Sequence, residues 1–172
     1  MGGAHGGGGC TMMSKKPGIA HIMKYVVFML IVVFVVLLML FASGSNKSFD
    51  EVRQGVEGSL DTEVLTEQEP AVFKRNFSLN AADYDGVMYY SSGSNISAEE
   101  VLLIKVKSES QIQEITDAID QRVEARINDF DGYAPDQVKL LENARQSVRG
   151  TYIFFACSQD ADAYLSAFGS SL

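Results

Sequence analysis

The sequence predicts an α+β fold, in which a single N-terminal transmembrane helix precedes a small, mostly antiparallel three-stranded sheet packed with helices. Three observations predict this fold. Residues 25–42 form an apolar run without charge, glycine or proline. Residues 109–130 repeat apolar side chains at helical spacing. Residues 150–157 are apolar on both faces, as in a central strand. After the run, the expected order of elements is α-α-β-β-α-α-β-α.

The apolar run at 25–42 predicts a membrane anchor. At about 1.5 Å per residue it spans roughly 27 Å, close to the roughly 30 Å of a bilayer's hydrocarbon. Three lysines and no acidic residue precede it. Basic residues beside a span stay in the cytoplasm, so the glycine-rich tail at 1–18 is expected to be cytoplasmic and disordered, and the domain at 48–172 extracytoplasmic. The alternative to an uncleaved anchor at 19–44 is a signal peptide cut after Gly44, although the run exceeds the usual signal core.

Two helices and a connection are expected first. Ser48 and Glu51 match a capping box, which opens a helix at 48–58. The polar residues 59–68 are expected to form a connection. A proline in the first turn then opens a helix at 70–77.

Two strands are expected next. Residues 87–91 are rich in residues that favour strands, and 100–107 alternate apolar and lysine side chains towards their end. The short loop at 92–95 suggests that the two strands pair antiparallel.

The second half of the domain predicts two helices, a strand and a short helix. Residues 109–130 carry the strongest apolar stripe, and Gly132 ends that helix. A proline begins the next helix at 135–148. The apolar strand at 150–157 and a last helix at 160–168 follow.

Composition limits the classes of partner. The chain has a formal net charge of −8, and because all 22 acidic residues but only 11 basic ones follow the apolar run, the domain carries about −11. Nucleic acids and anionic membrane surfaces need a basic footprint, so neither is an expected partner. Cys157 is the domain's only cysteine, and both histidines precede the run. An internal disulfide in the domain and histidine-based catalysis are therefore excluded.

Two Asp-x-Asp-Gly motifs, at 83–86 and 129–132, suggest calcium. Aligned on their glycines, neither places the required acidic ligands at the first and twelfth positions of an EF-hand loop. Turn chemistry explains both motifs better. We therefore predict no catalytic, cofactor-binding or metal-binding residues.

Arg122, Arg126 and Tyr133 are the candidate residues of a surface site. The two arginines lie about one turn apart on the predicted long helix, and Tyr133 follows it. Paired guanidinium groups could clamp an anion or a carboxylate. The alternative, which we favour, is a solvated helix face on which Asp117, Asp120 and Asp129 flank the arginines.

A set of short motifs resembles a known family. They comprise Lys74-x-x-Phe77-x-Leu79-Asn80-x-x-Asp83-Tyr84, Tyr89-Tyr90, Glu100, Ala118-Ile119-x-x-Arg122, Phe130-x-Gly132-Tyr133, Gly150-x-Tyr152 and Ser158-x-Asp160-Ala161. Over roughly 48–168, the chain resembles the bacterial family, found mainly in Firmicutes, that is catalogued as domain of unknown function 4358. The resemblance implies a fold and an extracytoplasmic location, and it implies no activity.

These observations favour a non-enzymatic binding or scaffolding module at the cell surface, held in the membrane by 25–42 and contacting a protein of the cell envelope. Two alternatives remain open. One is an extracytoplasmic hydrolase that uses carboxylates, because acidic residues are plentiful. The other is a carrier of a small ligand, which needs a concave pocket.

Overall fold

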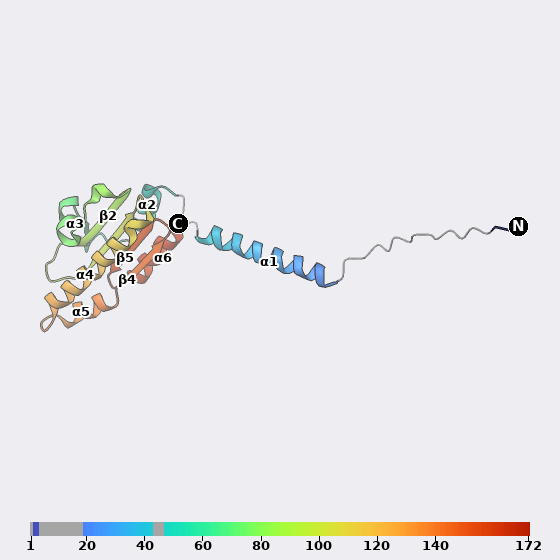
Figure 1. The fold of residues 1–172 in the computed structure, drawn as a ribbon. Coiled ribbons are helices and arrows are strands. Elements are labelled where there is room, and N and C mark those ends of the chain that lie inside the picture. Colours follow the sequence, from blue (N-terminus) through green and yellow to red (C-terminus); the bar gives the residue numbers. More distant parts are fainter. Residues whose placement is uncertain (1, 4–18, 43–46) are drawn as a thin grey trace. The chain divides into compact units, whose positions relative to one another are not determined.

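The computed structural model describes residues 2–3, 19–42 and 47–172 (Figure 1). Of residues 19–22 and 37–42 it describes the backbone alone. The chain divides into two compact units, Met1–Phe41 and Ala42–Leu172, which are described separately. Most of the predicted tail at 1–18, and the predicted cleavage point after Gly44, lie outside the described residues.

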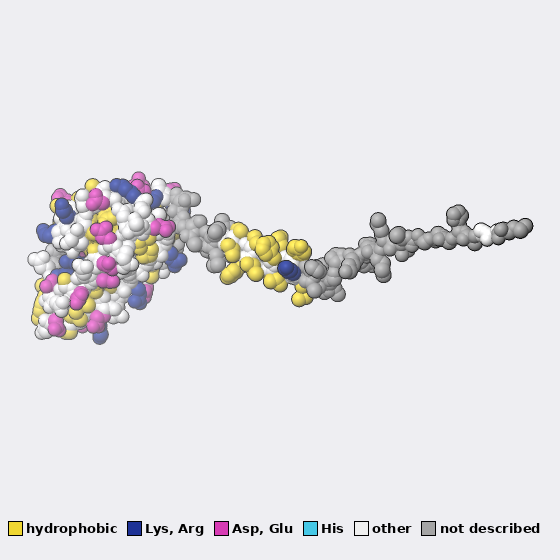
Figure 2. Space-filling model, in the orientation of Figure 1, with side chains coloured by type: hydrophobic (Ala, Val, Ile, Leu, Met, Phe, Trp, Pro, Cys, Tyr) yellow, Lys and Arg dark blue, Asp and Glu magenta, His cyan; other side chains and the backbone are white. Residues whose placement is uncertain are grey.

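Helix α1, Ile19–Ala42, belongs to the first unit except for its last residue. Its described side chains, at 23–36, are almost all apolar and exposed (Figure 2). No helix among the described residues is long and apolar enough to cross a membrane. The prediction of a transmembrane helix at 25–42 is therefore wrong.

The second unit is built on a five-stranded sheet. Its strands are β1 (Leu65–Glu67), β2 (Gly86–Ser92), β3 (Glu100–Lys105), β4 (Arg145–Arg149) and β5 (Tyr152–Cys157). They lie in the order β1-β2-β3-β5-β4, and every neighbouring pair is antiparallel. The α+β class agrees with the prediction, but the predicted count of three strands is wrong.

The two missed strands lie at the two edges of the sheet. β1 lies within the predicted connection at 59–68 and is held by the buried side chain of Leu65 and by pairing with β2. β4 was expected to be the end of a helix at 135–148, but that helix ends at Glu142. Pairing with the fully buried β5 outweighs the helical spacing there. Gly150, at φ 57°, permits the turn between them.

Helices cover both faces of the sheet. They are α2 (Phe49–Glu57), α3 (Pro70–Phe77), α4 (Ile112–Phe130), α5 (Pro135–Glu142) and α6 (Ala161–Ser171), with single 3₁₀ turns at Ala81–Asp83 and Glu109–Gln111. The predicted capping box is confirmed: the Ser48 side chain accepts from the Glu51 backbone N–H, and the Glu51 carboxylate accepts from the Ser48 N–H.

The core consists of two apolar layers, one on each face. β3 and β5 supply both layers because their side chains alternate between faces. α3, α4 and α5 cover one face, where Leu102 and Phe155 are buried among helix side chains. α2 and α6 cover the other, where Leu103 and Phe154 are buried. Burial on both sides makes the two central strands apolar throughout.

Candidate functional site

A polar pocket of about 460 Å³ opens between α3, the loop from β2 to β3, and α4. We call it the arginine pocket. Its charged lining residues are Arg75, Glu99, Glu100, Arg122 and Arg126. Most of the other lining residues carry hydroxyl or amide side chains, from β2, from the loop that follows it, and at Gln68 and Asn76. The pocket therefore offers charge and hydrogen bonds rather than an apolar surface.

α4 aims its arginines into this pocket because they share a stripe with its buried residues. Ile115, Ile119 and Phe130 are fully buried, and Arg122 and Arg126 fall between them at spacings of three and four. Residues with this spacing lie on one face of a helix. The predicted solvated face is therefore wrong: both side chains are less than one-fifth exposed.

A buried hydrogen-bond network fixes Arg122. Its Nε donates to Glu100 Oε1 at 3.3 Å, and its Nη2 donates to Oε2 at 3.2 Å. The Tyr89 hydroxyl donates to Glu100 Oε2 at 2.7 Å and accepts from Asn76 Nδ2 at 2.9 Å. Glu100 is 1% exposed, so three elements meet on one buried carboxylate. Sequence reasoning gave Glu100 and Tyr89 no role beyond a strand and the family motifs, and it did not single out Asn76.

The network also sets the protonation of its members. Burial raises the pKa of Tyr89, and the negative charge of Glu100 raises it further, so the phenol stays a donor. Burial lowers the pKa of Arg122, but attraction to Glu100 outweighs this effect, and the net result is a raised pKa. Both groups are therefore held in the state that the hydrogen bonds require.

Arg126 is held less tightly. Its Nη2 donates to the Ser97 carbonyl at 2.9 Å, and its Nη1 lies 3.6 Å from Asp129 Oδ2. Its guanidinium lies 4.3 Å from the centre of the Phe130 ring. Asp129 is one of the three predicted flanking carboxylates, and it is the one that pairs with an arginine here. Arg75, exposed in the last turn of α3, makes no hydrogen bond or ion pair with any described residue.

Tyr133 is not part of this site. Its side chain is 63% exposed and its ring packs against Phe130, with ring centres 5.8 Å apart. Tyr133 does not line the arginine pocket. The structure thus brings together two of the three predicted residues.

The Asp-x-Asp-Gly motifs lie where regular elements begin or end. Gly86 begins β2, and Gly132, at φ 82°, follows the end of α4. Across the described parts of the chain, no group of three or more His, Cys, Asp or Glu side chains is placed to hold a metal ion.

The comparisons agree with the motifs of this unit. The model of the family described as a domain of unknown function (DUF4358) matches residues 58–158, a range that contains every charged residue of the arginine pocket. No curated protein and no solved structure matches the chain significantly. The match covers more than half of the chain and lies within the predicted 48–168. The chain therefore belongs to the DUF4358 family of domains of unknown function.

Proposed function

We propose that the second unit is a non-enzymatic binding module at the cell surface, and that its arginine pocket receives the acidic group of a small polar ligand. One observation carries the proposal. Three arginines and two glutamates line this pocket, although acidic residues outnumber basic ones by about two to one in the unit. Acidic side chains are spread over the visible surface of the unit (Figure 2). A net positive pocket in such a field favours an anion.

The donors that remain free support this proposal. Arg122 donates to Glu100 through Nε and Nη2, and its Nη1 makes no hydrogen bond with a described residue. Arg126 Nε and the whole guanidinium of Arg75 are likewise unused by the described residues. Guanidinium donors bind carboxylates and phosphates in forked geometry. The pocket volume also lies within the range of roughly 300–1,000 Å³ that is usual for small-ligand pockets.

The glutamates of the pocket favour binding over hydrolysis. A carboxylate hydrolase needs two acids free to face the substrate. Both oxygens of Glu100 accept hydrogen bonds from Arg122, and those of Glu99 accept from the Ser158 and Ser97 hydroxyls at 3.2 and 3.4 Å. These two carboxylates are held by hydrogen bonds within the fold and are not free to face a substrate. This supports the binding module over the hydrolase. The ligand could be carried freely or presented on a cell-envelope protein.

The location of the module stays a prediction from the sequence. Cell fractionation, with protease added to intact cells, tests it. Digestion of the second unit in intact cells is expected for a surface protein, and full protection would contradict that location.

A matched pair of sugars tests the proposed binding. N-acetylmuramic acid carries a carboxylate that N-acetylglucosamine lacks, and both can be titrated into the full-length chain by NMR. We expect only the acid to shift the amide signals of the arginine pocket. Arg126→Gln should weaken its binding at least about tenfold, because a hydrogen bond to a charged group contributes roughly 1.5–3 kcal/mol.

Arg149→Gln is the control for charge. Arg149 is an exposed arginine of β4 outside the arginine pocket, so its loss changes the net charge equally. If Arg126→Gln and Arg149→Gln weakened binding of the acid equally, the effect of Arg126→Gln would be explained by long-range charge attraction alone. Equal binding of the two sugars, or failure of both N-acetylmuramic acid and inorganic phosphate to bind, would contradict the proposal.

A further inference from the structure

The sheet ends at β4 with an edge that no described strand covers. The direction of its backbone groups follows from the register. The Val106 N–H donates to the Thr151 carbonyl, and these residues continue the pairing of β3 with β5. Hydrogen-bonded positions alternate along an antiparallel strand, so Tyr152 and Phe154 bond towards β4.

The same alternation continues into β4. Its residues opposite Tyr152 and Phe154, which are Arg149 and Ser147, bond back to β5. Gln146 and Val148 therefore direct their backbone N–H and C=O groups away from the sheet. No described residue hydrogen-bonds to them from outside. Such groups are a template for another strand.

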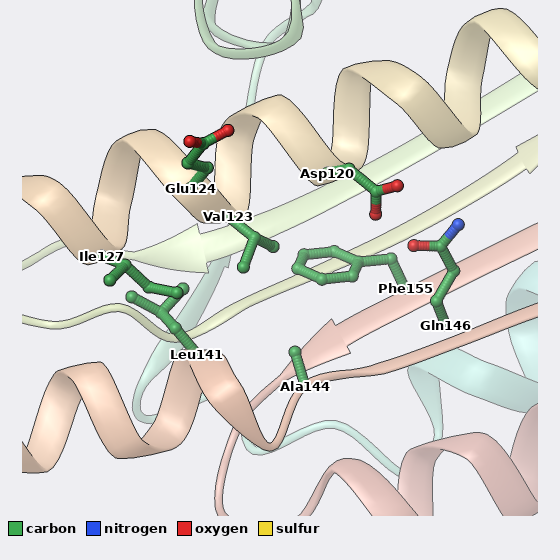
Figure 3. Close-up of a pocket in the computed structure, with 8 residues that line it drawn as sticks. All are labelled: Asp120, Val123, Glu124, Ile127, Leu141, Ala144, Gln146 and Phe155. Carbon is green, nitrogen blue, oxygen red and sulfur yellow. The ribbon is translucent and has the colours of Figure 1, made fainter.

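An apolar hollow of about 290 Å³ lies beside this edge, and we call it the Phe155 hollow (Figure 3). Phe155 of β5 lies at its centre, with side chains of α4, α5 and the segment after α5 around it. The apolar lining residues are Val123, Ile127, Leu141, Ala144 and Phe155. Gln146 extends from β4 at one end of the hollow (Figure 3). The hollow therefore lies on the face of the sheet to which Gln146 and Val148 point their side chains.

Two carboxylates on α4 border the Phe155 hollow. Asp120 and Glu124 are exposed, one helical turn apart, and neither makes a hydrogen bond or ion pair with a described residue. The hollow thus combines an apolar floor with a negative rim. An apolar side chain flanked by cationic side chains complements both features.

We propose that β4 and the Phe155 hollow bind an extended segment of a partner protein, which adds a sixth strand to the sheet. Residues opposite each other on neighbouring strands share a face. A partner residue opposite Gln146 or Val148 therefore points to the side of the hollow, where an apolar side chain fills it. Lysine or arginine two residues away on that strand reaches Asp120 and Glu124. Added strands are bound by main-chain hydrogen bonds, with pockets for alternate side chains supplying specificity.

Charge argues for a basic segment over a second copy of this chain. Pairing β4 with β4 would bring two units of about −11 together, each with its own acidic rim. Like charges at close range oppose association. This surface is distinct from the arginine pocket, so the inference goes beyond the proposed function.

Two synthetic heptapeptides test the inference on the full-length chain. The probe is Thr-Lys-Thr-Leu-Thr-Lys-Thr, whose leucine and lysines share one face of a strand. The control, with glutamate in place of both lysines, reverses the charge and keeps the leucine. Amide hydrogen exchange is followed by NMR at Gln146 and Val148. We expect the lysine peptide to slow exchange at both amides at least tenfold, and to bind at least tenfold more tightly than the glutamate peptide.

Variants separate the edge from the hollow. Val148→Pro removes an outward N–H and should abolish the protection of Gln146, whereas Val148→Thr keeps that N–H and should retain protection. The double variant D120K/E124K should reverse the preference between the peptides, and this result does not depend on folding of the proline variant. Unchanged exchange with the lysine peptide, equal binding of the two peptides, or unreversed preference in D120K/E124K would overturn the proposal. Protection that rises with protein concentration without peptide would also overturn it, in favour of a second copy.

Discussion

Replacing Arg122 with methionine tests whether the buried network holds the fold. The change leaves Glu100, whose side chain is 2% exposed, with the Tyr89 hydroxyl as its one remaining described donor. Loss of one partner of a buried ion pair costs about 3–5 kcal/mol. Because Arg122 borders an open pocket, water can reach the gap, and we expect the lower end, about 3 kcal/mol. For a unit of this size that corresponds to a fall in Tm of about 9–12 °C.

Arg53→Met is the matched control. Arg53 lies closer to its partners, 2.6 Å from Glu57 and 2.7 Å from Glu67, than Arg122 does to Glu100. The side chains of Arg53, Glu57 and Glu67 are nonetheless 30–49% exposed, and exposed ion pairs contribute about 0–1 kcal/mol to stability. If burial decides the strength of an ion pair, Arg122→Met should lose more stability than Arg53→Met. If distance decides it, Arg53→Met should lose more.

Urea unfolding followed by circular dichroism measures both losses. The double variant Glu100→Leu/Arg122→Met removes both charges and should cost less than the sum of the two single changes, since no buried charge is left unpaired. A loss for Arg122→Met no larger than for Arg53→Met would refute the reasoning. The buried network would then contribute no more to the stability of the fold than an exposed ion pair does.

Three further predictions concern single side chains. The pKa of Tyr89 is raised above its unfolded value near 10, so the contribution of Tyr89 to stability is complete below pH 10 and falls by up to about 1.4 kcal/mol per pH unit above pH 10. In urea titrations at rising alkaline pH, the stability difference between wild type and Tyr89→Phe should shrink by that slope. A difference that stays constant with pH would contradict this prediction. Burial, aided by the nearby glutamates, raises the pKa of the Cys157 thiol to about 12. In a Cys10→Ser variant, which leaves Cys157 as the chain's one thiol, a chromogenic disulfide reagent should therefore react in urea but not with the native protein at neutral pH. Gly86→Ala should lower the free energy of unfolding by about 1–3 kcal/mol, because the added Cβ meets the ring of Phe49. Gly93→Ala, with open space around its Cβ, should lower it by less than about 1 kcal/mol. Equal losses in the two variants would exclude the steric cause.

The sequence predicts best those elements whose signals are local. The capping box at Ser48 and the proline at the start of α3 fix helix ends within a few residues. The strands β1 and β4 have no such signal, because their own residues are mostly polar and partly exposed. They are strands because β2 and β5 offer them a partner. Edge strands of this kind are determined by pairing partners distant in sequence, which a local pattern does not contain.

The arginine pocket was predictable only in part. Arg122 and Arg126 were candidates from their spacing, but their partners come from a hairpin more than twenty residues away. The residue series 115, 119, 122, 126 and 130 was the available signal, because it places both arginines on the buried stripe. A charged residue at a core position implies a buried partner. That argument would have led to the search for Glu100.

The geometry of α4 explains how one helix serves both surfaces. Asp120 and Glu124 precede Arg122 and Arg126 by two residues each, which is about 200° around a helix of 3.6 residues per turn. The acids therefore border the Phe155 hollow, while the arginines line the arginine pocket on the opposite side. The two sites attract ligands of opposite charge and share no lining residue. Charge reversal at 120 and 124 should thus change the preference between the peptides without removing the donors on which anion binding depends. Arg126→Gln should weaken binding of the anion without affecting binding of the peptide strand at β4.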